Sequence, residues 1–183
     1  AGNEGPGDGS VGATLAYGRF ITVGNASTGR DFTRFLDVAG PDPVPADLLG
    51  VPMAVGYIIP AIDADLGPLP LVIASELDGG ANPDGCLPWS PGSLEGRVAL
   101  VPRGNCAFTD KARSVADASG LAIVVANQTP GEGAFPMNGD PSPIPAVMVD
   151  LAAGDALGAW AVDHLDATLT LRTGLVPLLW PGD

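Results

Sequence analysis

Two cysteines, Cys86 and Cys106, are the residues whose type and spacing most directly suggest chemistry in this sequence of 183 residues. Zinc sites generally use four ligands at short spacing, and the chain has no second cysteine pair and one histidine. A disulfide is the favoured interpretation, with two unrelated buried thiols as the alternative. A bond closing a loop of this size contributes about 3 kcal/mol on a chain-entropy model, and it persists only in an oxidising compartment.

The single histidine, His164, limits the catalysis that the chain could perform. A Ser-His-Asp hydrolase would need it as the base beside a serine on a strained elbow, and the G-x-S-x-G motif of that elbow does not occur. A glycosidase needs two paired carboxylates, and no pair stands out among the 21 Asp and Glu residues. We therefore expect no enzyme activity from this chain, with a small extracellular hydrolase as the alternative.

Acidic residues could also supply oxygen ligands to calcium, as Asp63 with Asp65 or Asn138 with Asp140. Neither pair reproduces a complete calcium loop, so structural turns are the favoured interpretation. A calcium-dependent structural surface domain remains an alternative. The sequence predicts no metal site and no cofactor.

The charge balance excludes two classes of partner. The formal net charge is −13, from 21 acidic and 8 basic residues, whereas nucleic acids and anionic membranes attract clustered cations. No apolar run approaches the roughly 18 residues that cross a bilayer. The chain begins without an export signal, so we expect that any such signal was removed or never included. Together, the acidic charge, the lack of a membrane-spanning run and the expected disulfide predict a secreted protein in an extracellular or periplasmic location.

The chain is long enough for one domain. Residues 1–10 are rich in glycine and are predicted to be a disordered leader. Alternation over residues 14–23 predicts a strand or hairpin, and further apolar residues follow before residue 44. We predict one domain over residues 11–176, with extra N-terminal strands in residues 11–44 and a tail at 177–183.

Short apolar runs bounded by proline and glycine predict the remaining strands. They lie at residues 55–59, 69–74, 97–101, 121–127, 145–149 and 167–173. A first helix is predicted at residues 108–119, with Thr109 as its N-cap and Gly120 as a left-handed residue after its end. A second helix begins after Asp150 as the N-cap. Its glycines, Gly154 and Gly158, are unfavourable in helices and indicate close packing.

Several motifs between these elements resemble the protease-associated (PA) domain family. They are Cys86 in a loop, a strand at 98–101, the turn Arg103-Gly104-Asn105-Cys106-Ala107-Phe108 with Lys111 on the next helix, and Ile144-Pro145-Ala146-Val147 before a helix with Gly154. The resemblance covers residues 45–173. Residues 11–44 have no clear counterpart in the family.

The resemblance implies an α/β fold of the swivelling β/β/α type, in which a β-sandwich or open barrel is flanked by two helices. It implies a bond between Cys86 and Cys106. It also implies a non-catalytic module that binds a protein or peptide, or an attached protease domain, either free-standing or as part of a larger secreted protease.

Five residues are candidates for peptide binding: Trp89, Arg103, Gly104, Asn105 and Phe108. Trp89 lies in a proline-rich loop, where aromatic residues often anchor partners, with packing over the disulfide as the alternative. Arg103 could meet a carboxylate of a partner or pair with an acid of its own chain. Phe108 could contact a peptide or belong to the core. Lys111 is expected to be a solvated charge on the helix.

Overall fold

The structure, a computed structural model, describes residues 30–57, 60 and 62–179. The predicted leader at 1–10 and the predicted strand at 14–23 lie outside the described residues. The chain divides into two compact units, Phe32–Leu178 and a second unit made of Ala1–Asp31 and Leu179–Asp183. The architecture described below is that of Phe32–Leu178, and the predicted domain boundaries stay a prediction.

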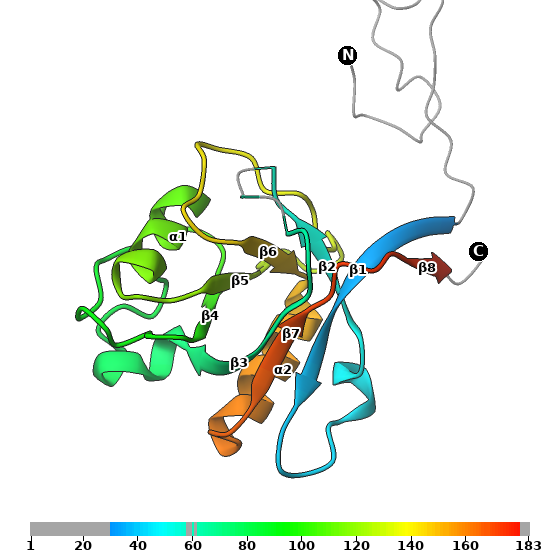
Figure 1. The fold of residues 1–183 in the computed structure, drawn as a ribbon, viewed down its shortest axis with the longest axis horizontal. Helices are drawn as coiled ribbons and strands as arrows, with labels where there is room; N and C mark the ends of the chain where they lie inside the picture. The colour runs from blue at the N-terminus through cyan, green and yellow to red at the C-terminus, as the bar shows by residue number, and fades with distance from the viewer. Residues whose placement is uncertain (1–29, 58–59, 61, 180–183) are drawn as a thin grey trace, which may run out of the picture. The chain divides into compact units, whose positions relative to one another are not determined.

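Single strands and pairs of consecutive strands are separated by helices or 3-10 segments along this unit (Figure 1). The strands are β1 (Arg30–Ala39), β2 (Val51–Val55), β3 (Leu66–Ile73), β4 (Val98–Pro102), β5 (Ala122–Ala126), β6 (Ala146–Val149), β7 (Thr168–Leu171) and β8 (Val176–Leu179). The helices are α1 (Phe108–Asp117) and α2 (Leu151–Asp163), with 3-10 segments η2 (Ala46–Leu48) and η3 (Ala74–Gly80). β1 lies within the predicted extra strands at 11–44, and β8 overlaps the segment predicted to be a tail.

The strands form one sheet in the order β2-β6-β5-β4-β3-β7-β1-β8, and β1 additionally pairs with β2. This second pairing aligns Arg34 with Met53 and Leu36 with Val51, so that strands β1 to β7 close into a barrel. β3, β4, β5 and β6 are parallel neighbours, whereas β1, β2 and β7 pair antiparallel. The predicted α/β fold, a barrel flanked by two helices, is confirmed.

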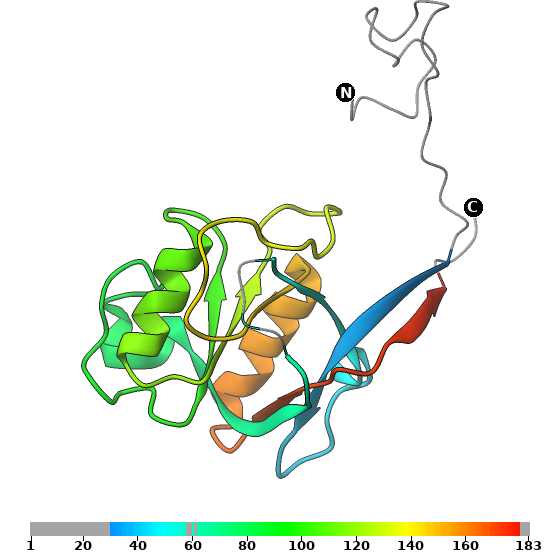
Figure 2. The ribbon, with the colours of Figure 1, turned by 45° about the horizontal axis from the view of Figure 1, so that its top comes forward.

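β4 and β5 are apolar along nearly their whole length because both of their faces are covered. Val98 and Leu100 of β4 belong to a core cluster that includes Leu157 of α2, whereas Ala99 and Val101 belong to a second cluster that includes Val115 of α1. Figure 2 shows β4 and β5 between the two helices. The two predicted helices therefore cover opposite faces of β4 and β5, α1 on one face and α2 on the other.

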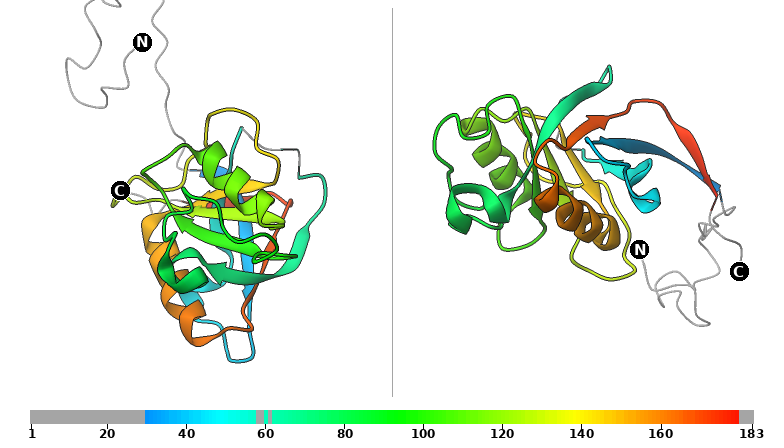
Figure 3. Two further views of the ribbon diagram at one scale, coloured as in Figure 1. Left: turned by 90° about the vertical axis from the view of Figure 1, so that its left-hand side faces the viewer. Right: turned by 90° about the horizontal axis from the view of Figure 1, so that it is seen from below.

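The first core cluster also fills the barrel. Its members on β1 and β7 are Leu36, Val38, Leu169 and Leu171, all buried. Figure 3 shows β1 and β7 on the side of the barrel away from α1. Within the described part of the chain, no helix is long and apolar enough to cross a membrane.

The ends of α1 differ from the prediction. Its N-cap is Ala107, which makes no side-chain cap, and the buried Thr109 hydroxyl donates instead to the backbone oxygen of Asp140 at 2.8 Å. The left-handed residue after the helix is Ser119, with φ of 68°, and not Gly120. A side chain at Gly120 would come within 2.4 Å of the Val115 Cγ1 atom, so space explains this glycine. Both end predictions for α1 were wrong.

The second helix begins as predicted, because the Asp150 carboxylate accepts a hydrogen bond from the Ala153 N–H at 2.8 Å. Its two glycines differ. A Cβ atom at Gly154 would lie 2.4 Å from the Cβ atom of Ala126 on β5, whereas one at Gly158 would lie 3.9 Å from its nearest neighbour, Leu100. Close packing therefore requires Gly154 alone.

We expect Gly154→Ala to lower the free energy of unfolding by about 1–3 kcal/mol, because the added methyl group forces α2 away from β5. The matched variant Gly158→Ala meets only an ordinary contact, and its better helix propensity raises stability by up to about 1 kcal/mol. Urea denaturation of the two variants measures the difference. Equal effects would contradict the packing argument.

Candidate functional site

The predicted disulfide is present. Cys86 and Cys106 are joined at 2.05 Å, with Cα atoms 5.8 Å apart, which excludes two unrelated thiols. The bond connects the loop at residues 81–94 with the turn between β4 and α1. It therefore fixes the turn that carries most of the predicted binding residues.

That turn has a conformation that few side chains adopt. Gly104 has φ of 100° and Asn105 has φ of 66°, in the left-handed region that glycine and asparagine tolerate best. A side chain at Gly104 would also come within 2.6 Å of the Gln128 Oε1 atom. The Asn105 side-chain amide donates to the Asp84 carboxylate at 2.8 Å, and this bond is the main cause of the lowered pKa of Asp84.

Lys111 is buried and not solvated as expected, with 0% of its surface exposed. Its ammonium group donates to the backbone oxygen of Asp84 and lies 3.4 Å from the Cys86 Sγ atom. The loop at 81–94 covers this face of α1, since the Ser114 hydroxyl also donates to the Leu87 carbonyl. Burial lowers the pKa of Lys111, an effect that the Asp84 charge partly opposes.

Arg103 follows β4 at the start of the turn and has three partners from its own chain. Its Nη1 atom donates to the Asn127 side-chain oxygen at 2.9 Å and pairs with the Glu132 carboxylate at 2.6 Å. The guanidinium carbon lies 4.8 Å from the centre of the Phe135 ring, in cation–π contact. Of the two alternatives for Arg103, the structure contains the pair with an acid of its own chain. The Arg103 side chain is nevertheless 28% exposed.

Asn127 organises these partners from a buried position at the end of β5. Its amide nitrogen donates to the Gly133 carbonyl at 2.6 Å and to Glu132 at 3.1 Å, while its oxygen also accepts from the Gln128 N–H at 2.8 Å. The bond from Asn127 is the largest cause of the lowered pKa of Glu132, followed among the lowering contacts by the bond from Arg103. Asn127 was not among the binding residues predicted from the sequence. The feature that could have indicated it is a polar residue directly after an apolar strand.

The two predicted aromatic residues have different positions. Phe108 is half-buried and meets the Phe135 ring edge to face, with centroids 6.5 Å apart. Trp89 is only 6% exposed and belongs to the core cluster under α1. Trp89 is therefore a buried core residue, and its predicted contact with a peptide stays a prediction. We use the name Arg103 surface for the other four predicted residues together with two contacts of Arg103 and Phe108. Its members are Arg103, Gly104, Asn105, Phe108, Glu132 and Phe135.

His164 has structural partners. It is the C-cap of α2, its ring stacks on Trp160 with centroids 4.3 Å apart, and its Nδ1 atom lies 2.7 Å from the Trp160 carbonyl oxygen. Its Nε2 atom lies 3.4 Å from the Asp42 carboxylate. Across residues 30–57, 60 and 62–179, no group of three His, Cys, Asp or Glu residues could hold a metal ion.

The family model described as PA domain matches residues 68–157 of this chain. A curated relative, signal peptide peptidase-like 3 of Arabidopsis thaliana, is 38% identical over 82 residues, which are 43% of this chain and 15% of the relative. The matched residues of the family model run from β3 into α2. They include the disulfide and the whole Arg103 surface.

Solved structures of two aminopeptidases also align with the chain. The zinc aminopeptidase BSAP of Bacillus subtilis does so with a TM-score of 0.49 and 18% identity, over 78% of this chain and 33% of its own. An aminopeptidase of Aneurinibacillus sp. strain AM-1 does so with a TM-score of 0.45 and 22% identity, over 81% of this chain and 36% of its own. The chain thus spans a minor part of each of these proteins.

The buried Lys111 predicts a measurable pH dependence of stability. Because its pKa is lowered in the folded state, the unfolded chain binds more protons than the folded chain between that lowered pKa and the ordinary pKa of about 10.4. We expect this group to make stability rise with pH across that interval, by at most about 1.4 kcal/mol per pH unit. Urea denaturation at several pH values should show a shallower rise for Lys111→Met than for the unmodified chain.

The matched control is Arg113→Met, which removes the same charge from the solvated face of α1, where the Arg113 side chain is 56% exposed. This variant should keep the pH dependence of the unmodified chain. Parallel profiles for the chain and Lys111→Met would contradict the buried charge.

Proposed function

Because residues 68–157 of this chain are a PA domain, a module typical of protease accessory regions, we propose that the chain binds a protein or peptide and performs no catalysis itself. The partner is either a separate polypeptide or a protease domain attached in a longer protein. The Cys86–Cys106 bond supports an extracellular or periplasmic location, since such bonds persist under oxidising conditions.

The observation that carries this proposal is the unused hydrogen-bonding capacity of Arg103. A guanidinium has five N–H donors. Among the described residues, the bonds of Arg103 use Nη1 alone. Nε and Nη2 are therefore free to donate to a backbone carbonyl or carboxylate of a partner, from a side chain that remains 28% exposed.

The surroundings of Arg103 support recognition with little loss of conformational freedom on binding. The Phe135 ring, Asn127 and Glu132 hold the guanidinium in one orientation. The disulfide and the bond from Asn105 to Asp84 hold the turn beside it. A preorganised group contributes more to affinity because less entropy is lost when the partner binds. Phe108 and Phe135 add apolar area next to this polar group.

Selection from a random peptide library against the full chain provides a ligand for the test. We expect Arg103→Gln to weaken binding of the selected peptide by roughly tenfold, as loss of charged hydrogen bonds at a partly exposed site does. Titration calorimetry measures the affinity, and mass spectrometry of the peptide after incubation measures hydrolysis.

Arg113→Gln is the matched control, because it removes an exposed arginine of α1 that lies outside the Arg103 surface. It should leave affinity unchanged, and both variants should melt near the unmodified chain. Equal affinities for the two variants would remove Arg103 from the site. A cleaved peptide would overturn the non-catalytic function.

A further inference from the structure

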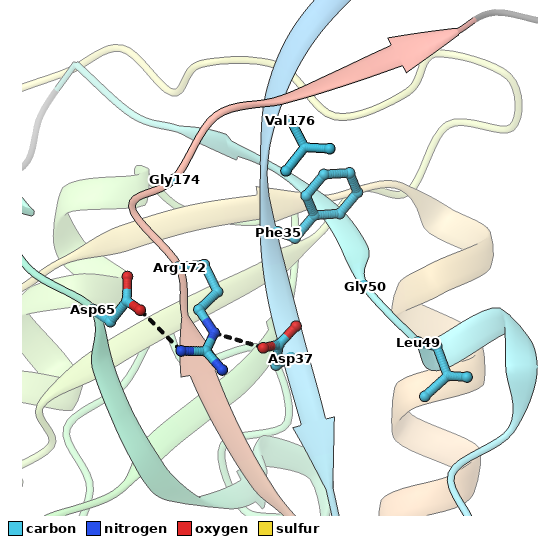
Figure 4. Close-up of a pocket in the computed structure, with 8 residues that line it drawn as sticks. All are labelled: Phe35, Asp37, Leu49, Gly50, Asp65, Arg172, Gly174 and Val176. Carbon is cyan, nitrogen blue, oxygen red and sulfur yellow. Dashed lines mark hydrogen bonds and ion pairs between the residues drawn. The ribbon is translucent and has the colours of Figure 1, made fainter.

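A hollow lies on the outer face of β1, and it shares no residue with the Arg103 surface (Figure 4). Its volume is about 530 Å³, within the range of ligand-binding clefts. One end is apolar and the other carries charged groups. The residues that define it are Phe35, Asp37, Leu49, Asp65, Arg172 and Val176.

The alternation of β1 explains why this face is available. Leu36 and Val38 point into the barrel core and are buried. Phe35 and Asp37 therefore point outward, since successive side chains of a strand lie on opposite faces. Leu49, beyond the η2 segment, is 64% exposed and Val176 on β8 is 46% exposed. The apolar end thus presents side chains that are not covered by the described residues.

The charged end is held rigidly by an arginine between two carboxylates. The Arg172 Nε atom lies 2.5 Å from Asp37, and its Nη1 atom lies 2.9 Å from Asp65. The backbone N–H and hydroxyl of Thr173 donate to the other Asp65 oxygen at 2.8 and 2.9 Å. These bonds, led by the Thr173 N–H, lower the pKa of Asp65 to about 2, so the carboxylate is ionised at physiological pH.

Charge decides which occupant fits. Two carboxylates and one guanidinium leave this end with an excess negative charge. The Asp65 oxygens are both engaged, whereas Asp37 uses one oxygen for Arg172 and has no further partner in the described part of the chain. The net charge of −13 also disfavours a second copy of this chain and an acidic peptide.

We propose that this hollow docks an extended segment of a partner polypeptide that carries an aliphatic side chain next to a lysine or arginine. The aliphatic side chain lies against Phe35 and Val176, and the cation lies at the free oxygen of Asp37. The hollow is a contact surface in addition to the Arg103 surface. The inference does not rest on the function proposed for Arg103.

The probes are two peptides, acetyl-Leu-Lys-Leu-Lys-amide and acetyl-Leu-Glu-Leu-Glu-amide, titrated into the labelled full chain and followed by NMR. We expect the basic peptide to cause saturable shifts at the amides of Phe35, Gly50 and Gly174, with weaker binding at high salt because the charges are exposed. The acidic peptide should cause none. Equal binding of the two peptides, shifts elsewhere, or no binding of the basic peptide would overturn the proposal.

Variants separate the two ends of the hollow. Asp37→Asn should weaken binding of the basic peptide by roughly threefold to tenfold, as loss of one exposed charge pair does. Asp117→Asn, at an exposed residue of α1 outside the hollow, should leave binding unchanged. Leu49→Ser should weaken binding, and Leu87→Ser, at a similarly exposed leucine outside the hollow, should not. Equal effects within either pair would remove that end from the site.

Gly174→Leu provides a steric test. A Cβ atom at Gly174 meets nothing within 4 Å and Gly174 lines the hollow, so we expect the larger side chain to occupy the hollow and to leave the fold intact. We expect it to abolish the shifts while the melting temperature is retained. Unchanged binding by this variant would overturn the proposal. Self-association that depends on Leu49 would assign the hollow to a second copy and would overturn it as well.

Discussion

The closure of the barrel by β1 is the constraint on which the rest of this structure depends. β1 pairs with β7 along Leu36 to Ala39 and with β2 along Arg34 to Leu36. Without that strand, the core between β2 and β7 would be open to water on one side. β1 lies before the residues that match the PA domain family model, so an N-terminal segment outside the match completes the barrel.

A second set of contacts gives the Arg103 turn one conformation. The disulfide, the buried Lys111 ammonium and the Asn105 side chain all meet the segment around Asp84 and Cys86. The Lys111 ammonium loses its hydration in this buried position. Its hydrogen bond to the Asp84 backbone oxygen replaces part of the hydrogen bonding that water supplied. The loop at residues 81–94 and the turn after β4 thus support each other, although neither has regular secondary structure of its own at the contact.

Local patterns predicted the elements whose burial is uniform. β4, β5, α1 and α2 were recognisable because apolar runs and helical spacing follow from covered faces. The expectations for Lys111 and Thr109 were wrong because loops from distant parts of the chain cover both side chains, and no local sequence pattern shows this cover. The partner of Arg103 could not be chosen among 21 acids, since Glu132 lies 29 residues further along the chain and is held beside Arg103 by a hydrogen bond from Asn127.

The close contact between Gly154 of α2 and Ala126 of β5 has a consequence for the Arg103 surface. Ala126, against which Gly154 packs, immediately precedes Asn127, the amide that orients Arg103. Bulk introduced into the helix pushes on the strand one residue before that amide. A substitution at Gly154 that displaces β5 is therefore expected to displace the Asn127 amide as well, whereas one at Gly158 leaves that strand in place.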